Sequence, residues 1–172
     1  FGVTAKEDES PLTAADLAAH HAILAGLQRL TPDIPVLSEE SADISFAERS
    51  QWRRYWLVDP LDGTKEFVQR NGQFTVNIAL IEESEPVLGV VRVPVTGVCY
   101  FAARGYGAFR ESPSQPPQRI AVKPLRSGEP VRVVGSRSHG GSSLQAFVAR
   151  LGPHELVTIG SSLKLCQVAE GS

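Results

Sequence analysis

The chain has 172 residues, of which 42% are hydrophobic and 21% charged, a balance typical of a folded globular protein. This length fits one ordinary domain, or one and a half closely joined layers. The formal net charge of −2 gives no reason to expect a surface that binds nucleic acid. No apolar run is long enough to form an integral membrane segment, so membrane-spanning functions are excluded as well.

The first predicted element is a helix that begins after Ser10-Pro11-Leu12. Thr13 can cap it, and Asp16, three residues on, can complete a capping box. An apolar stripe follows at helical spacing, formed by Leu17, Ile23, Leu24, Leu27 and Leu30. Thr31-Pro32 ends the helix, because a residue before proline disfavours helical geometry. His20 and His21 lie inside it and are interpreted as surface or packing residues.

Strands dominate the next part of the chain. Residues 34–37 form a short predicted strand, residues 42–54 are polar and irregular, and the apolar run 55–58 is a strand that ends at Asp59. One or two helical turns are expected at 64–68, and alternating apolar side chains predict a long strand over 74–80. The further strands of an antiparallel meander are expected at 87–93, 98–102 and 108–110.

The last third of the chain has a different pattern. Residues 112–130 contain five prolines and are predicted to connect two parts, 1–111 and 131–172. Beyond them, strands at 131–134 and 156–159 alternate with helices at 144–151 and 162–170. The order predicts an α+β fold of layered helices and sheets. Neither a Gly-x-Gly-x-x-Gly nor a Gly-x-x-x-x-Gly-Lys loop is present, which excludes the usual nucleotide-binding fingerprints.

The two cysteines, Cys99 and Cys166, both lie in apolar surroundings. We expect two buried free thiols, with a disulfide as the alternative.

The run Asp59-Pro60-Leu61-Asp62-Gly63-Thr64 concentrates the chemistry. Two carboxylates held close together at the end of a strand repel each other and favour a cation, and hard oxygen ligands suit Mg²⁺. The Leu61 carbonyl is placed to be a third ligand. Gly63 permits close backbone approach, and N–H groups at the start of the helix at Thr64 can bind an anion. The alternative is a plain turn between a strand and a helix.

Glu39 and Glu40 also follow an apolar strand. Neighbouring side chains there point in opposite directions, so one of the two can face Asp59 and Asp62 while the other points away. A solvated acidic loop is the alternative for this pair. Asp16 can likewise be a helix cap and nothing more.

Taken together, Ser10-Pro11-Leu12-Thr13-Ala14-Ala15-Asp16, Glu39-Glu40 and Asp59 to Thr64 resemble the motifs of the inositol monophosphatase-like, lithium-sensitive phosphatases. Within this family the chain is most similar to the branch that removes the 3′-phosphate from adenosine 3′,5′-bisphosphate. The features of that branch are Lys65-Glu66-Phe67, Arg70 to Asn77, Ser136 to His139 and Gly160 to Lys164. The likeness extends from about Lys6 to the last residue.

The resemblance implies a layered α/β/α/β sandwich of the inositol monophosphatase and fructose-bisphosphatase type, with its C-terminal part incomplete. It implies a cytoplasmic enzyme of sulfur metabolism, for which peripheral contact with the inner membrane is allowed. The expected products are AMP and phosphate. The expected mechanism uses two or three Mg²⁺ ions and an activated water, without a phosphoenzyme.

The resemblance also assigns roles to residues. Glu39, Asp59, Asp62 and the Leu61 carbonyl would bind metal, and Thr64, Asp16 and Glu39 would be catalytic. The N–H groups of Gly63 and Thr64 would hold the phosphate. The remaining substrate-binding residues would be Ser136, Arg137, Ser138, His139, Ser162 and Lys164, although Lys164 can also be simply solvated.

The chain departs from the family pattern in one important place. Family members carry a further metal-binding Asp just after a Trp, whereas Trp52 and Trp56 are followed here by Arg53 and Leu57. We therefore expect a fragment that lacks both ends of the family domain and is weakly active or inactive alone. An inositol or sugar phosphatase, and a remnant that binds metal or nucleotide without turnover, are the alternatives.

Overall fold

The computed structural model describes residues 3–5, 11–41, 44–126, 128–137 and 141–172. In chain order its first elements are β1 (Val3–Ala5), β2 (Pro11–Thr13), α1 (Ala14–Leu30), β3 (Val36–Ser38), α2 (Phe46–Arg49), β4 (Arg54–Asp62) and α3 (Thr64–Val68). The remaining elements are β5 (Thr75–Glu82), β6 (Glu85–Arg92), β7 (Cys99–Ala103), β8 (Gly107–Ser112), β9 (Gln115–Ile120), β10 (Val131–Ser136), α4 (Ser142–Val148), β11 (His154–Ile159) and α5 (Leu163–Glu170).

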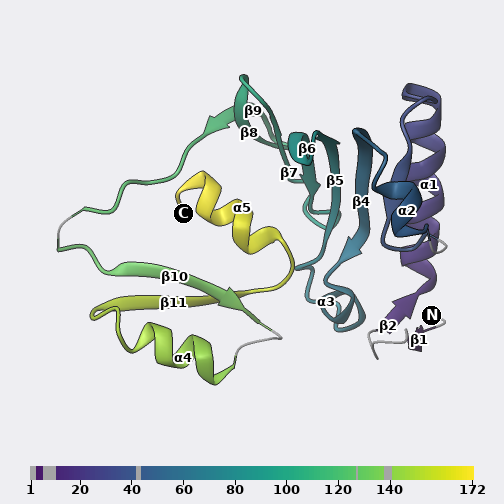
Figure 1. The fold of residues 1–172 in the computed structure, drawn as a ribbon. Coiled ribbons are helices and arrows are strands. Elements are labelled where there is room, and N and C mark those ends of the chain that lie inside the picture. The colour runs from purple at the N-terminus through teal and green to yellow at the C-terminus, as the bar shows by residue number, and fades with distance from the viewer. Residues whose placement is uncertain (1–2, 6–10, 42–43, 127, 138–140) are drawn as a thin grey trace.

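The largest layer is a sheet in which, among the described residues, seven strands follow the order β3-β4-β5-β6-β7-β8-β9 (Figure 1). Only β3 and β4 pair in parallel, and the other neighbours are antiparallel. The predicted meander is therefore confirmed. It keeps the strands that surround Asp59 close in sequence, so the local chain alone builds this part of the site.

Helix α1 packs beside β4 on one face of this sheet. The predicted capping box at Thr13 and Asp16 is present. Trp56 Nε1 donates to Thr31 Oγ1 at 2.9 Å, which ties the strand to the end of the helix. The predicted apolar stripe is only partly buried, because Leu27 is 7% exposed whereas Leu30 is 79% exposed.

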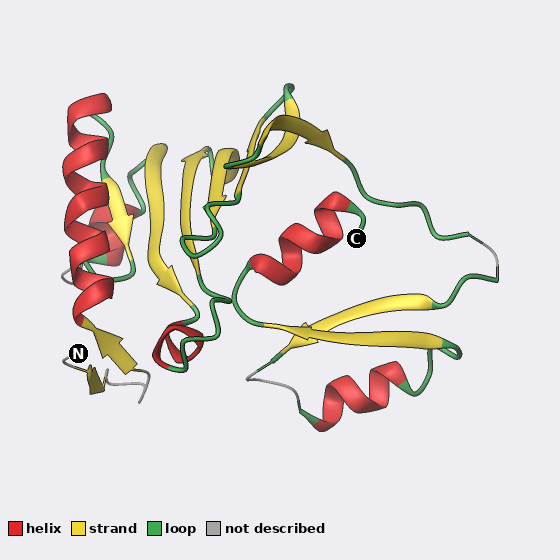
Figure 2. Ribbon diagram, turned by 180° about the vertical axis from the view of Figure 1, so that it is seen from behind, coloured by secondary structure: helices red, strands yellow, loops and turns green. Residues whose placement is uncertain are grey.

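A second, smaller layer follows the large sheet. Strands β10 and β11 pair in parallel, and α4 connects them. Figures 1 and 2 show α5 between this pair and the large sheet, so the end of the chain returns toward the first layer. Together the two layers and their helices confirm the predicted α+β class.

Several stretches differ from the sequence-based expectation, among them the unpredicted pair of β1 with β2 before the first helix. Strand β4 does not end at Asp59 but continues to Asp62, with a break in register between these residues where Pro60 cannot donate a ladder hydrogen bond. Helix α2 forms in the segment expected to be irregular, because the Ser45 side chain caps it. Strand β9 forms inside the predicted connection, since an edge strand tolerates Pro116 and Pro117.

Both cysteines are buried free thiols, as predicted. The division into parts 1–111 and 131–172 remains a prediction, although β9 shows that the large sheet extends beyond residue 111. Within the described ranges, no helix has the length and apolar character needed to cross a bilayer.

Candidate active site

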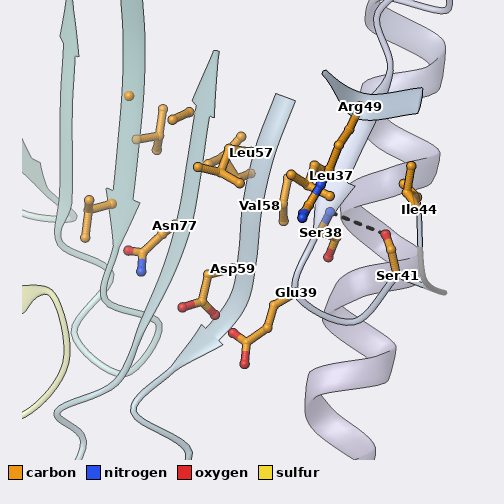
Figure 3. Close-up of a pocket in the computed structure, with 15 residues that line it drawn as sticks. Leu37, Ser38, Glu39, Ser41, Ile44, Arg49, Leu57, Val58, Asp59 and Asn77 are labelled. Atoms are coloured by element: carbon orange, nitrogen blue, oxygen red, sulfur yellow. Dashed lines mark hydrogen bonds between the residues drawn. The ribbon is translucent and has the colours of Figure 1, made fainter. Parts of the chain in front are cut away.

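Glu39 directly follows β3, Asp59 lies within the neighbouring strand β4, and the two side chains face each other. The parallel pairing of β3 with β4 sets Ser38 beside Val58, and Glu39 N donates to Val58 O at 3.0 Å. The next residue of each strand therefore points to the same face of the sheet. Figure 3 shows the two carboxylates pointing toward one another. The strand geometry thus selects Glu39, and not Glu40, as the partner of Asp59.

The surroundings of Asp59 oppose its ionisation. Burial, as the largest cause, together with the negative charges of Glu39 and Asp62 raises the pKa of Asp59 to about 7. A hydrogen bond from Leu61 N to Asp59 Oδ1, 3.1 Å long, acts in the opposite direction. Crowded carboxylates of this kind are stabilised by a cation between them.

The groove that contains this pair has a volume of about 640 Å³. Glu39, Asp59 and Asn77 form its polar part, and Figure 3 shows them below the apolar side chains of the same sheet face. Its apolar part includes Leu57, Ala79 and Val91. The acidic pair is therefore accessible from an open, partly apolar surface.

Asp62 is held on the other side by donors from two elements. Its Oδ2 accepts from the backbone N–H of Ser162 and from Asn77 Nδ2 at 3.5 Å, and the Thr75 hydroxyl oxygen lies 3.5 Å from it. Thr75 and Asn77 belong to β5, while Ser162 immediately precedes α5. Asp62 thus connects the acidic strand end to the C-terminal part of the chain.

Gly63 and Thr64 lie where the sequence predicts a close approach of backbone. Gly63 has φ +92°, and a Cβ there would lie 3.2 Å from both Gln73 O and Ser161 Cβ. Only glycine adopts such a conformation without cost in so tight a place. Thr64 Oγ1 donates to Leu61 O over 3.5 Å, so the hydroxyl and the predicted metal-binding carbonyl are adjacent.

Asp16 is 1% exposed and is held by its own helix start. Its Oδ2 accepts from Thr13 N at 2.9 Å and from the Thr13 hydroxyl. Strand β2, which carries Thr13, packs against α3, which begins at Thr64. The catalytic pairing of Asp16 with Thr64 that the family resemblance implies remains a prediction.

The predicted substrate-binding residues fall into two groups. Arg137, directly after β10, donates to Gln73 Oε1 at 2.9 Å, and Gly160 N donates to the same oxygen at 2.9 Å. Ser136 ends β10 beside them. Lys164 Nζ donates to Ser161 O at 2.5 Å, so this ammonium folds back on the start of its own helix. Ser138 and His139 lie outside the described residues.

The acidic residues form a pair and a neighbour, not a closed cage. In the part of the chain that the structure describes, no group of three or more His, Cys, Asp or Glu side chains is arranged to enclose an ion. Glu39 and Asp59 face each other, whereas Asp62 Oδ2 is directed to Thr75, Asn77 and Ser162. The predicted metal-ligand set therefore remains a prediction.

Sequence reasoning gave Gln73, Thr75 and Asn77 no role in the site, although they belong to the run Arg70 to Asn77 that carries the resemblance. The alternation over 74–80 assigned Thr75 and Asn77 to the face opposite the apolar residues, yet Thr75 is 0% exposed. The available signal was the position of two polar side chains, two residues apart, on the strand that follows the acidic motif. Asn77 is the direct register partner of Asp59.

Comparison with known proteins agrees with this geometry. The model of the inositol monophosphatase family matches residues 1–172. A relative from Salmonella typhimurium, named 3′(2′),5′-bisphosphate nucleotidase CysQ, is 56% identical over 166 residues, which are 96% of this chain and 65% of the relative. The chain thus spans slightly less than two thirds of that relative's length.

Solved structures show the same fold. The crystal structure of CysQ from Bacteroides thetaiotaomicron superposes with a TM-score of 0.81 at 42% identity, covering 96% of this chain and 66% of that one. An inositol monophosphatase/NADP phosphatase complexed with Mg²⁺ and phosphate gives a TM-score of 0.79 at 21% identity, covering 99% and 62%, and this likeness concerns the fold alone. The layered sandwich expected from the sequence is therefore confirmed, and the chain belongs to the inositol monophosphatase family.

Proposed function

We propose that this chain forms the metal- and phosphate-binding part of a Mg²⁺-dependent phosphomonoesterase that converts adenosine 3′,5′-bisphosphate to AMP and phosphate. The observation that carries the proposal is the facing pair Glu39 and Asp59, in which burial and like charge raise the pKa of Asp59 to about 7. The substrate follows from the 56% identity to a relative named as a bisphosphate nucleotidase. Its partner is thus a small-molecule phosphate ester, and we propose a cytoplasmic location.

The donors fit Mg²⁺. Glu39, Asp59, Asp62 and the Leu61 carbonyl offer only oxygen ligands, which Mg²⁺ prefers, and the family resemblance implies two or three ions. When bound, Mg²⁺ would neutralise the phosphate dianion and lower the pKa of the attacking water. Without that neutralisation the carboxylates would repel the phosphate, so the same residues would oppose binding.

The chain's own groups then orient the reactants. The backbone N–H groups of Gly63 and Thr64 would hold the phosphate at the start of α3, where first-turn N–H groups lack acceptors within the helix. The Thr64 hydroxyl, already turned to Leu61 O, would hold the attacking water. Asp16, buried in the first turn of α1, would accept the proton that the water releases.

The decisive test uses a chimera. The flanking segments of the Salmonella relative that lie outside the matched region are joined to this chain, and phosphate release from adenosine 3′,5′-bisphosphate is measured with Mg²⁺ or with EDTA. We expect Mg²⁺-dependent release that Asp59→Asn reduces by about 100-fold or more, because a ligand is lost. The unmodified relative is the positive control. A folded chimera that releases no phosphate while the relative does would refute the proposal.

An inositol phosphatase is the second candidate, favoured by the family match over the whole chain. The same chimera is therefore assayed on inositol 1-phosphate. A higher kcat/KM on that ester would refute the nucleotidase assignment and retain the phosphatase. The 172-residue chain alone should release phosphate weakly or not at all, because it contains no Asp directly after Trp52 or Trp56.

A further inference from the structure

A directed chain of hydrogen bonds ends at Asp62. Thr75 Oγ1 lies 2.9 Å from Ser162 Oγ, and Ser162 Oγ donates to Asn77 Oδ1 at 2.9 Å. Asn77 Nδ2 then donates to Asp62 Oδ2 at 3.5 Å. Thr75 is fully buried, so its hydroxyl needs a partner within the protein. This series of hydrogen bonds therefore joins two side chains of β5 to the residue before α5.

The direction of these hydrogen bonds follows from the number of hydrogens that each group can donate. A hydroxyl has one hydrogen, and that of Ser162 goes to the Asn77 carbonyl oxygen, which can only accept. The contact between Thr75 and Ser162 must then be a donation from Thr75. The Asn77 amide group is left to donate to the carboxylate of Asp62, so each member has one fixed orientation.

We infer that Thr75, Asn77 and Ser162 are positioning residues that orient the Asp62 carboxylate for metal binding. This inference rests on the proposed function, in which Asp62 is a metal ligand. Ser162 N and Asn77 Nδ2 both donate to Oδ2, and the oxygen of the Thr75 hydroxyl lies 3.5 Å from the same atom, which leaves Oδ1 as the oxygen offered to a metal. Outer partners of this kind commonly change metal affinity by about 10- to 100-fold.

The arrangement also couples metal binding to the docking of α5. Ser162 lies 100 residues beyond Asp62, and its backbone N–H reaches the carboxylate only when the start of α5 is seated against the large sheet. If docking of α5 strengthens Mg²⁺ binding through this contact, then Mg²⁺ binding must favour the docked helix by the same free energy. Mg²⁺ should therefore protect residues 163–170 from hydrogen exchange, although the proposed ligands lie elsewhere in the sequence.

The test compares two variants of one residue in the 172-residue chain. Thr75→Val keeps the shape and removes the hydroxyl, whereas Thr75→Ser keeps the hydroxyl and removes a methyl group. Mg²⁺ titrated by calorimetry should bind Thr75→Val about tenfold more weakly than the wild type, and Thr75→Ser within about twofold of it. Thr96→Val, the same change at an exposed turn residue, should leave the affinity unchanged.

Further measurements distinguish a loss of Mg²⁺ affinity from a defect in folding. Ser162→Ala, which retains the backbone N–H, should also weaken Mg²⁺ binding, and its circular dichroism spectrum and that of Thr75→Val should match the wild type. At a Mg²⁺ concentration ten times the dissociation constant, exchange of the α5 amides should slow by about tenfold in the wild type. That protection should be reduced in Ser162→Ala.

Three outcomes would overturn the inference. They are a Thr75→Val variant with wild-type affinity, equal losses in Thr75→Val and Thr75→Ser, and a wild-type chain that binds no Mg²⁺. If the chimera releases no phosphate from adenosine 3′,5′-bisphosphate while these affinities behave as expected, the result would instead count against the proposed function alone. The two proposals therefore fail in different measurements.

Discussion

Asp59 is a carboxyl group whose ionisation the surrounding fold opposes. Its pKa of about 7 arises first from burial, and then from Glu39 and Asp62. In the unfolded chain its pKa returns to the ordinary value of 3.8. Between these two values the native protein binds more protons than the unfolded one, so this residue's contribution to stability is present below about pH 4 and is lost as the pH rises through about 7.

A pH series therefore isolates this residue. In EDTA, the free energy of unfolding of Asp59→Asn relative to the wild type should increase between about pH 4 and pH 7 and level off above it, because the amide has no charge to desolvate. Urea unfolding at four pH values measures it, with Glu155→Gln in an exposed ion pair as the control. A difference that does not depend on pH would contradict the raised pKa.

At this scale, much of the acidic site could be predicted. Glu39 follows one apolar run, and Asp59 and Asp62 follow another, so the local sequence places all three at the same end of two adjacent strands. The partners of Asp62 could not be predicted in the same way. The backbone N–H of Ser162 reaches Asp62 across 100 residues, and no local pattern encodes which distant backbone group will return to a given carboxylate.

Among the elements, α3 packs against the end of β11 so closely that Gly160, which follows β11, has no room for a side chain. A Cβ at Gly160 would lie 2.5 Å from Glu66 Cγ and 2.8 Å from Gln73 O. Glu66 is itself buried, and Gln73 O belongs to the backbone, so neither can move easily. The two layers can approach this closely only because residue 160 has no side chain.

Gly160→Ala should therefore destabilise the protein by about 1–3 kcal/mol through overpacking. The matched control is Gly26→Ala in the interior of α1, where a Cβ would meet nothing within 4 Å. That change should stabilise by about 0.5–1 kcal/mol, because alanine loses less backbone entropy than glycine. Thermal and urea unfolding measure both. Equal effects at the two sites would contradict the close contact at Gly160.

Element types were more predictable than element ends. Alternating and continuous apolar runs located the strands of the large sheet, because burial on the faces of a sheet requires them. Strand β9 was missed because its two prolines indicate a loop, and only its place at the sheet edge makes them acceptable. Edge position is a property of the assembled sheet, which a single segment of sequence does not contain.

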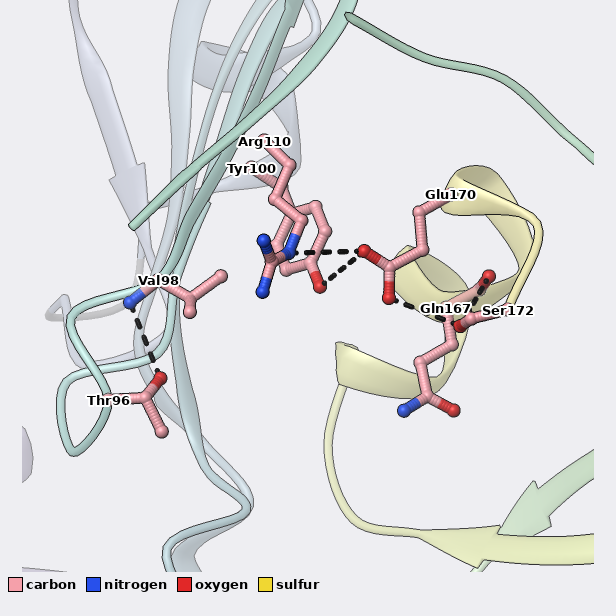
Figure 4. A network of polar contacts seen from close by, with 7 residues as sticks. All are labelled: Thr96, Val98, Tyr100, Arg110, Gln167, Glu170 and Ser172. Atoms are coloured by element: carbon pink, nitrogen blue, oxygen red, sulfur yellow. Dashed lines mark hydrogen bonds and ion pairs between the residues drawn. The ribbon is translucent and has the colours of Figure 1, made fainter. Parts of the chain in front are cut away.

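Across the whole molecule, α5 is anchored to the large sheet at its far end as well. Glu170 Oε2 lies 3.2 Å from Arg110 Nε and accepts from Tyr100 OH at 3.1 Å (Figure 4). The Arg110 and Glu170 side chains are only 33% and 19% exposed, so solvent weakens this ion pair less than one at the surface. The helix is thus fixed at the Asp62 end and at the Glu170 end.

Glu170→Ala should destabilise the chain by about 1–2 kcal/mol, because it leaves a half-buried guanidinium and a phenol without their acceptor. Glu85→Ala breaks an exposed pair with Arg104 and should cost about 0.5 kcal/mol or less. Chemical unfolding provides both values. Hydrogen exchange should also speed up in α5 for Glu170→Ala alone, and unchanged exchange there would contradict the anchoring role.

The prolines of β9 have a consequence for assembly. An edge strand normally presents unpaired N–H groups that can template a strand from another molecule. Pro116 and Pro117 carry no N–H and lie where the pairing with β8 shifts register, so the outer edge of the sheet offers a poor template there. Replacing both by threonine should promote fibril formation on agitation, measured by thioflavin fluorescence. Two rigid rings at the sheet boundary would then protect the protein against amyloid growth.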